Sequence, residues 1–159
     1  VIGMTALLFV LLNLVQIIAF GAPFGTSAAP DFRITGYSVA DARAFLDAIG
    51  DSGRGVFFGY FRWLDTVFPP LLALSLVILF RQIRPLRRGL VVGLFALLPL
   101  AYLVADLAEN AALKTLQTEE GFARAVSLAS DATILKYSIL GVTALLLLLF
   151  AVLERKASR

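Results

Sequence analysis

Four long apolar stretches, separated by polar segments, dominate the pattern of this sequence. They cover residues 1–20, 56–80, 89–113 and 132–153. An α-helix needs about 20 predominantly apolar residues to cross a hydrocarbon core about 30 Å thick, and each stretch is long enough. The pattern therefore predicts an all-α, integral membrane four-helix bundle in which residues 1–159 form a single domain.

The segment between the first two stretches, residues 22–55, has a helical pattern of its own. Ser38 is a typical N-cap, and Gly50 follows the last apolar residue of the pattern. Apolar side chains recur at helical spacing from Val39 to Ile49, with charged residues between them. We therefore expect an extracytoplasmic amphipathic helix that lies on the membrane or covers the bundle. Residues 51–53 then predict a turn before the second span.

Composition agrees with a membrane location and removes several kinds of chemistry. The chain is 60% hydrophobic, with a mean hydropathy of +0.90, against about 45–50% apolar residues in ordinary soluble domains. It contains no cysteine and no histidine, so thiol catalysis, zinc–thiolate sites, haem ligation by histidine and imidazole acid–base chemistry are excluded. No metal ligand set and no catalytic residue is predicted, and the cofactor is unknown.

The basic residues predict the orientation in the membrane. The net charge is +3, and basic side chains gather in the break at residues 81–88 and in the tail at 155–159. The positive-inside rule puts both segments in the cytoplasm. We therefore expect a cytoplasmic (inner) membrane protein with both termini inside and residues 22–55 outside. Because topology explains these charges, no nucleic-acid partner is expected.

A signal peptide is the alternative interpretation of the first stretch, because small residues follow it. The stretch is long for the apolar region of a signal peptide and lacks a basic start. These two properties favour a retained membrane span.

Polar and ionisable side chains interrupt all four stretches. In the third stretch they recur at i, i+4, i+7 and i+8, which places them on one face of a helix. In the predicted topology the whole set lies toward the outer side, so we expect one outward-facing pocket. Ionisable groups at membrane depth are costly and by default indicate a functional site. The candidate ligand-binding residues are Asn13, Gln16, Arg62, Asp65, Tyr102, Asp106, Glu109, Asn110 and Lys136.

A purely structural interpretation of these residues stays open. Lys136 paired with Glu109 or Asp106, and Arg62 paired with Asp65, would hold the helices together without a ligand. Acidic residues nevertheless outnumber basic ones, since Asp131 adds a fourth carboxylate to the set. The excess favours a bound cation or a protonated carboxylate.

Short motifs spread over most of the chain carry a family resemblance. They include Asp41-Ala42-Arg43, Gly53-Arg54, Asp65-x-x-Phe68-Pro69 and Asp106-x-x-Glu109-Asn110. With them the chain resembles an uncharacterised bacterial family of small four-transmembrane-helix proteins. The resemblance implies the four-span fold and the importance of the acidic positions and Asn110, and it brings no activity with it.

Three functions are compatible with this pattern. The favoured one is a non-enzymatic membrane protein whose intramembrane polar pocket binds a small ligand, a lipid headgroup or a cation. The second is an accessory or scaffolding subunit of a larger membrane complex, or a homo-oligomer, in which small residues such as Gly93 would contact a protein partner. The third is a lipid-modifying enzyme that depends on carboxylates.

Overall fold

The computed structural model describes residues 1–21, 29–83 and 89–157, and the described residues are mostly helical, without a strand. The arginines at 84, 87, 88 and 159, on which part of the orientation prediction rests, lie outside this part. The elements are α1 (Ile2–Phe20), the 3₁₀ turn η1 (Pro30–Phe32), α2 (Val39–Val56), the π-helical turn η2 (Phe57–Phe61), α3 (Arg62–Gln82), α4 (Gly89–Lys114), the 3₁₀ turn η4 (Thr115–Gln117) and α5 (Phe122–Ala157).

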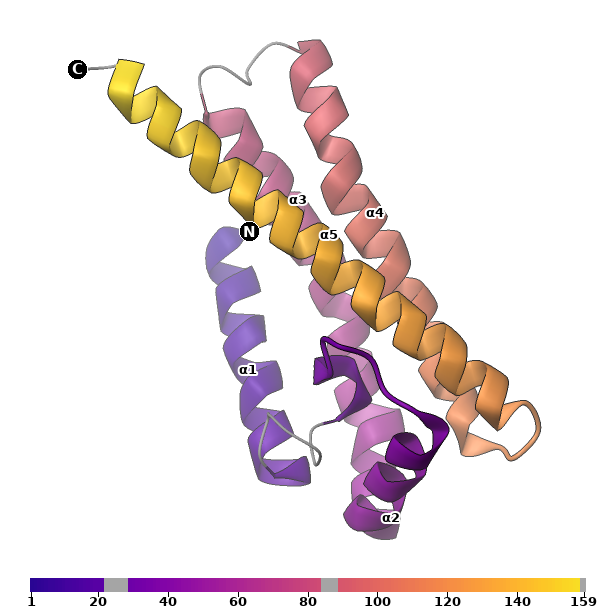
Figure 1. The fold of residues 1–159 in the computed structure, drawn as a ribbon. Coiled ribbons are helices and arrows are strands. Elements are labelled where there is room, and N and C mark those ends of the chain that lie inside the picture. Colours follow the sequence, from indigo (N-terminus) through magenta and orange to yellow (C-terminus); the bar gives the residue numbers. More distant parts are fainter. Residues whose placement is uncertain (22–28, 84–88, 158–159) are drawn as a thin grey trace.

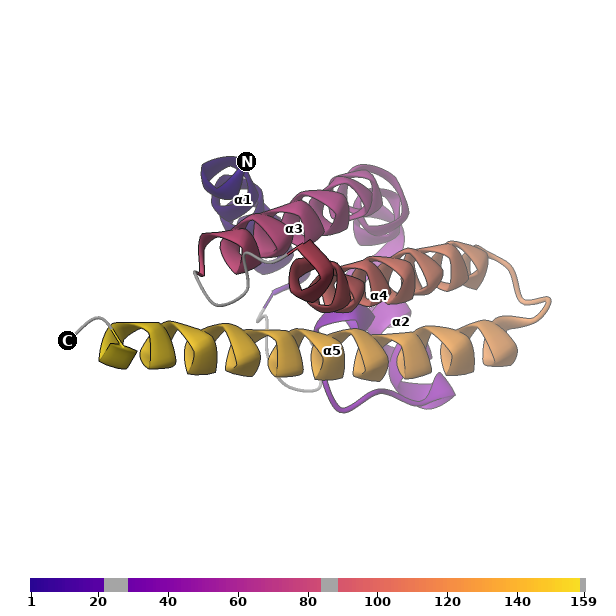
Figure 2. The same ribbon diagram turned by 90° about the horizontal axis from the view of Figure 1, so that it is seen from above.

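The long helices run alternately up and down (Figure 1). The end of α3, the start of α4 and the end of α5 lie at one end of the bundle, α1 starts nearer its middle, and α2 lies at the other end. Neighbours in sequence are neighbours in space, because α1 packs on α3, α3 on α4 and α4 on α5. The view from above shows α1 and α5 on opposite sides of α3 and α4 (Figure 2).

Four helices are long and apolar enough to cross a membrane, as the sequence predicts. Their outward faces carry large apolar side chains that the protein leaves uncovered. Leu7, Ile18 and Leu145 are 70%, 82% and 68% exposed, respectively. Apolar surface of this extent is unfavourable in water, and helices of this length and composition are suited to contact with lipid.

The helix predicted between the first two spans is present as α2. Its N-cap is Ser38, whose hydroxyl accepts from the backbone N–H of Asp41, while the Asp41 carboxylate accepts from the Ser38 N–H. The predicted end at Gly50 corresponds to a break in the helix, whereas the predicted turn at residues 51–53 is wrong, because these residues are helical. Gly50 has φ 59° and ψ −171°, a conformation open essentially only to glycine, and the helix resumes beyond it. It then continues through η2 into α3.

The last helix begins at Phe122, ahead of the predicted start at residue 132. Gly121 lies just before it with φ 73°, a backbone conformation that favours glycine. Its first turns bury an apolar stripe, Ala125, Val126 and Ala129, against the rest of the bundle. Because charged residues alternate with this stripe, hydropathy alone places the start too late.

An aromatic core fills the α2 end of the bundle. Phe20, Phe45, Phe57 and Phe61 pack mostly edge to face, with ring centroids 5.2–5.8 Å apart in those pairs. Edge-to-face packing is a favoured arrangement of aromatic rings. Leu113, Leu116 and the first turns of α5 complete this aromatic core.

The glycines at 93 and 141 do not bring helices of this chain together. A side chain at either position would meet no described atom within 4 Å. The expected contact between Gly93 and a protein partner stays a prediction.

Candidate functional site

A network of buried charges lies just inside the aromatic core. Its first centre is Arg62, at the start of α3 and 1% exposed. The Arg62 Nη1 donates to Asp31 Oδ2 at 2.6 Å, to Asn110 Oδ1 at 2.6 Å and to Asp65 Oδ2 at 3.1 Å. The guanidinium also lies 4.5 Å from the ring centroid of Phe57, a cation–π distance. Arg62 therefore joins α3, α4 and η1 to the aromatic core.

The second centre is Lys136 of α5, which is buried between two acidic side chains of α4. Its Nζ donates to Asp106 Oδ1 at 3.0 Å and pairs with Glu109 Oε2. Thr133, one turn earlier on α5, donates to the other carboxylate oxygen of Glu109. Asn110 connects the two centres, because its Nδ2 donates to Asp106 Oδ2 at 3.1 Å.

Asp31, which the sequence analysis counted as part of the outer loop, is a full member of this network. The turn η1 carries it into the bundle, where its side chain is 2% exposed. Its backbone carbonyl accepts from the Tyr137 hydroxyl of α5 at 3.1 Å. A proline at the first position of the turn and a buried ion pair fix this segment against α3 and α5.

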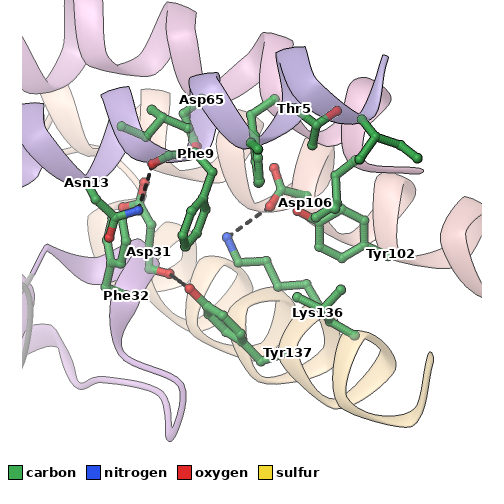
Figure 3. Close-up of a pocket in the computed structure, with 16 residues that line it drawn as sticks. Thr5, Phe9, Asn13, Asp31, Phe32, Asp65, Tyr102, Asp106, Lys136 and Tyr137 are labelled. Atoms are coloured by element: carbon green, nitrogen blue, oxygen red, sulfur yellow. Dashed lines mark hydrogen bonds and ion pairs between the residues drawn. The ribbon is translucent and has the colours of Figure 1, made fainter. Parts of the chain in front are cut away.

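The network forms one wall of a cavity of about 370 Å³ between α1, α3, α4 and α5 (Figure 3). Asp31, Asp65, Asp106 and Lys136 supply the charged part of its lining. The remaining walls are mainly apolar and aromatic. They comprise Ile2, Thr5, Ala6, Phe9, Leu12, Asn13, Phe32, Phe68, Leu72, Tyr102, Tyr137 and Leu140.

The cavity extends from the charged network away from the aromatic core. On α4, the cavity residue Tyr102 lies one turn before Asp106, whereas the core residue Leu113 lies after it. On the antiparallel helix α5, the cavity residue Leu140 lies one turn after Lys136 and so on the same side of the network as Tyr102. The aromatic core thus closes the α2 side. The α1–α5 pair is not among the closely packed helix pairs of the described chain, although both helices line the cavity.

The structure brings most of the predicted site residues together. Asn13, Asp65, Tyr102, Asp106 and Lys136 line the cavity. Behind them, Arg62, Glu109 and Asn110 belong to the buried network. Both ion pairs of the structural interpretation are formed.

The structure differs from the predictions at two polar residues, Asp131 and Gln16. Asp131 is exposed and takes no part in the network, so Asp31 is the fourth carboxylate in its place. Gln16 is fully buried but does not line the cavity, and its amide atoms have no hydrogen-bond partner among the described residues. Asn13 donates to the carbonyl of Phe9 on its own helix at 2.8 Å.

The arrangement suits recognition better than metal binding. Each acidic side chain of the network is paired with a basic one, and the described residues hold no group of three or more acidic, His or Cys side chains arranged for a metal ion. Four carboxylates face two cations, which leaves two formal negative charges in a buried place. A proton or a positively charged group lowers the energy of such an excess.

Comparison with protein-family models, with curated proteins and with solved structures finds no match for this chain. The family resemblance described above stays a prediction.

Proposed function

We propose that the chain is an integral protein of the cytoplasmic membrane, with both termini inside, whose intramembrane cavity binds a small ligand, a lipid headgroup or a cation. The observation that carries this proposal is a cavity of about 370 Å³ that joins mainly apolar walls to a charged network. Small-molecule sites typically measure about 300–1,000 Å³ and combine apolar walls with a few fixed polar groups. In this orientation the charged network lies in the outer half of the bundle.

The buried network supports binding by holding the polar wall in one geometry. Arg62 pairs with Asp31 of η1 and with Asp65 of its own helix, and Lys136 pairs with Asp106 and Glu109 of α4. Polar groups held in this way reorganise little when a ligand binds, and this lowers the cost of binding. No nucleophile activated by a neighbouring base is found among the described cavity residues, so we propose a binding function and not catalysis.

The test compares two tryptophan variants on the same helix. Ala6 lines the cavity, whereas Leu7 lies next to it on the exposed face of α1. We expect wild-type protein, purified in mild detergent and examined by native mass spectrometry, to carry a small bound molecule. Ala6→Trp should remove that additional mass by filling the cavity, and Leu7→Trp should retain it. An additional mass that survives Ala6→Trp unchanged, or its absence from the wild type, contradicts the proposal.

A further inference from the structure

Two buried residues on the cavity wall, Asp65 and Tyr102, each have a polar side-chain atom without a hydrogen-bond partner among the described residues. Asp65 accepts from Arg62 through Oδ2, and its Oδ1 accepts nothing. The Tyr102 hydroxyl also has no described partner, although this residue is only 3% exposed. A polar atom that faces a cavity without a partner can form a hydrogen bond with an occupant. Asp65 and Tyr102, both labelled in Figure 3, therefore mark the place where a polar group of an occupant binds.

The distribution of charge indicates the sign of that polar group. The other three carboxylates of the network are each engaged through both oxygens: Asp31 by Arg62, Asp106 by Lys136 and Asn110, and Glu109 by Thr133 and Lys136. The uncompensated negative charge thus meets the cavity at Asp65. A cationic donor there would satisfy the free oxygen and reduce the excess charge at the same time.

The other walls indicate what the cation is attached to. Ile2, Ala6, Leu72 and Leu140 offer only apolar atoms. A hydrated inorganic ion gains nothing from such walls, whereas an apolar body buries its surface there at about 25 cal/mol per Å². The aromatic rings of Tyr102 and Tyr137 add surfaces on which an ammonium group is favourably placed.

The way into the cavity is from the side. Ile2 and Phe9 of α1 line the cavity and are nevertheless 41% and 53% exposed. On the opposite wall, α5 contributes Tyr137 and Leu140 without packing closely on α1. The mouth therefore lies between α1 and α5, on a face that lipid covers in a membrane. The occupant reaches the site from the bilayer.

Resting on the proposed function, we infer that the occupant is a small cationic amphiphile. A single protonated or quaternary amine binds at Asp65 and Tyr102, and an apolar body of limited size fills the space between α1 and α5. At about 370 Å³ the cavity accepts a drug-sized molecule and excludes a complete two-chain phospholipid.

Three probes of equal chain length separate charge from apolar burial. Octylamine, octanol and octanoate are equilibrated with lipid nanodiscs that contain the protein, and binding to empty nanodiscs is subtracted. We expect octylamine to bind about tenfold or more tightly than octanol, and octanoate to bind weakest, because a charged hydrogen bond contributes about 1.5–3 kcal/mol. Ala6→Trp should abolish octylamine binding.

Variants then locate the amine. Asp65→Asn should remove the preference for octylamine over octanol, and the exposed Asp131→Asn should preserve it. If Asp65→Asn does not fold, Tyr102→Phe provides the second measurement, and it should weaken octylamine binding severalfold while octanol binding changes little. Equal binding of all three probes, still blocked by Ala6→Trp, would overturn the cationic assignment and leave the proposed function intact. Probe binding that Ala6→Trp does not reduce would overturn both.

Discussion

At the scale of single residues, burial separates two aspartates that look alike in the sequence. Asp31 is buried and ion-paired with Arg62, whereas Asp131 is exposed. Asp31→Asn should lower the free energy of unfolding by about 1.5–3 kcal/mol, because it weakens charged hydrogen bonds inside the bundle. Asp131→Asn should change it by no more than about 0.5 kcal/mol. Unfolding of both variants in detergent micelles measures the difference, and equal effects would contradict the buried position of Asp31.

Lys136 provides a second test at this scale, because two carboxylates share one cation. Lys136→Met should cost about 3–5 kcal/mol, since it leaves Asp106 and Glu109 buried without their countercharge. Adding Glu109→Gln should restore part of this loss, because one of the uncompensated charges is then gone. A double-mutant cycle on the free energy of unfolding measures the coupling. Additive losses would show that Lys136 and Glu109 do not act together.

These residues also show where prediction from sequence succeeds and fails. Asp106, Glu109 and Asn110 share one face by helical spacing, so a local pattern was enough to group them. Asp131 lies five positions before Lys136, which turns it well away from the face of Lys136 on the same helix. Asp31 lies in an irregular segment, and only tertiary packing buries it. No periodic signal distinguishes it from a solvated loop residue.

At the scale of elements, two glycines in α2 should respond oppositely to the same substitution. Gly50 has φ 59° and ψ −171°, and a side chain there is strained by about 1–3 kcal/mol. Gly55 is in the helix with open space around it, so an added methyl group favours the folded state by up to about 1 kcal/mol. Gly50→Ala should therefore lower the thermal midpoint and Gly55→Ala should raise it. A rise for Gly50→Ala would be incompatible with the bend at this position.

The contact between α2 and the turn before α5 should depend on pH. Arg43 donates to Glu119 at 2.7 and 3.1 Å and holds the pKa of this carboxyl below its ordinary value. A lowered folded-state pKa stabilises the fold above the unfolded pKa, about 4.3, and the contribution is lost as the pH falls through the folded value. NMR titration should find a lower pKa for Glu119 in the wild type than in Arg43→Gln. An unchanged pKa in that variant would exclude the pair in solution.

Element boundaries were harder to predict than element identity. The capping residue Ser38 follows from local chemistry, and the structure confirms it. Local chemistry does not predict the continuation of α2 through η2 into α3, because this continuation depends on long-range packing of Phe57 and Phe61 in the aromatic core. Residues 51–53 favour a turn locally, but they are helical because the burial of these aromatic side chains outweighs the local preference.

At the scale of the whole molecule, the arrangement of the four long helices predicts which segments share a side of the membrane. The ends of α3 and α5 lie together, and the turn between α4 and α5 lies at the opposite end of the bundle (Figure 1). Basic residues such as Arg81 and Arg155 mark the first end, so it should face the cytoplasm. The chain contains no cysteine, and any single introduced cysteine is therefore a unique label site.

Gln117→Cys and Arg155→Cys put that label at the two ends. Both positions are exposed. We expect a membrane-impermeant maleimide to modify the first variant in intact cells and the second only after the membrane is permeabilised. The opposite pattern would invert the orientation and move the charged network to the cytoplasmic half, while leaving the bundle unchanged. Modification of both variants in intact cells would be incompatible with an odd number of crossings between them. The α5 helix alone separates these two positions, so this result would remove it from the membrane.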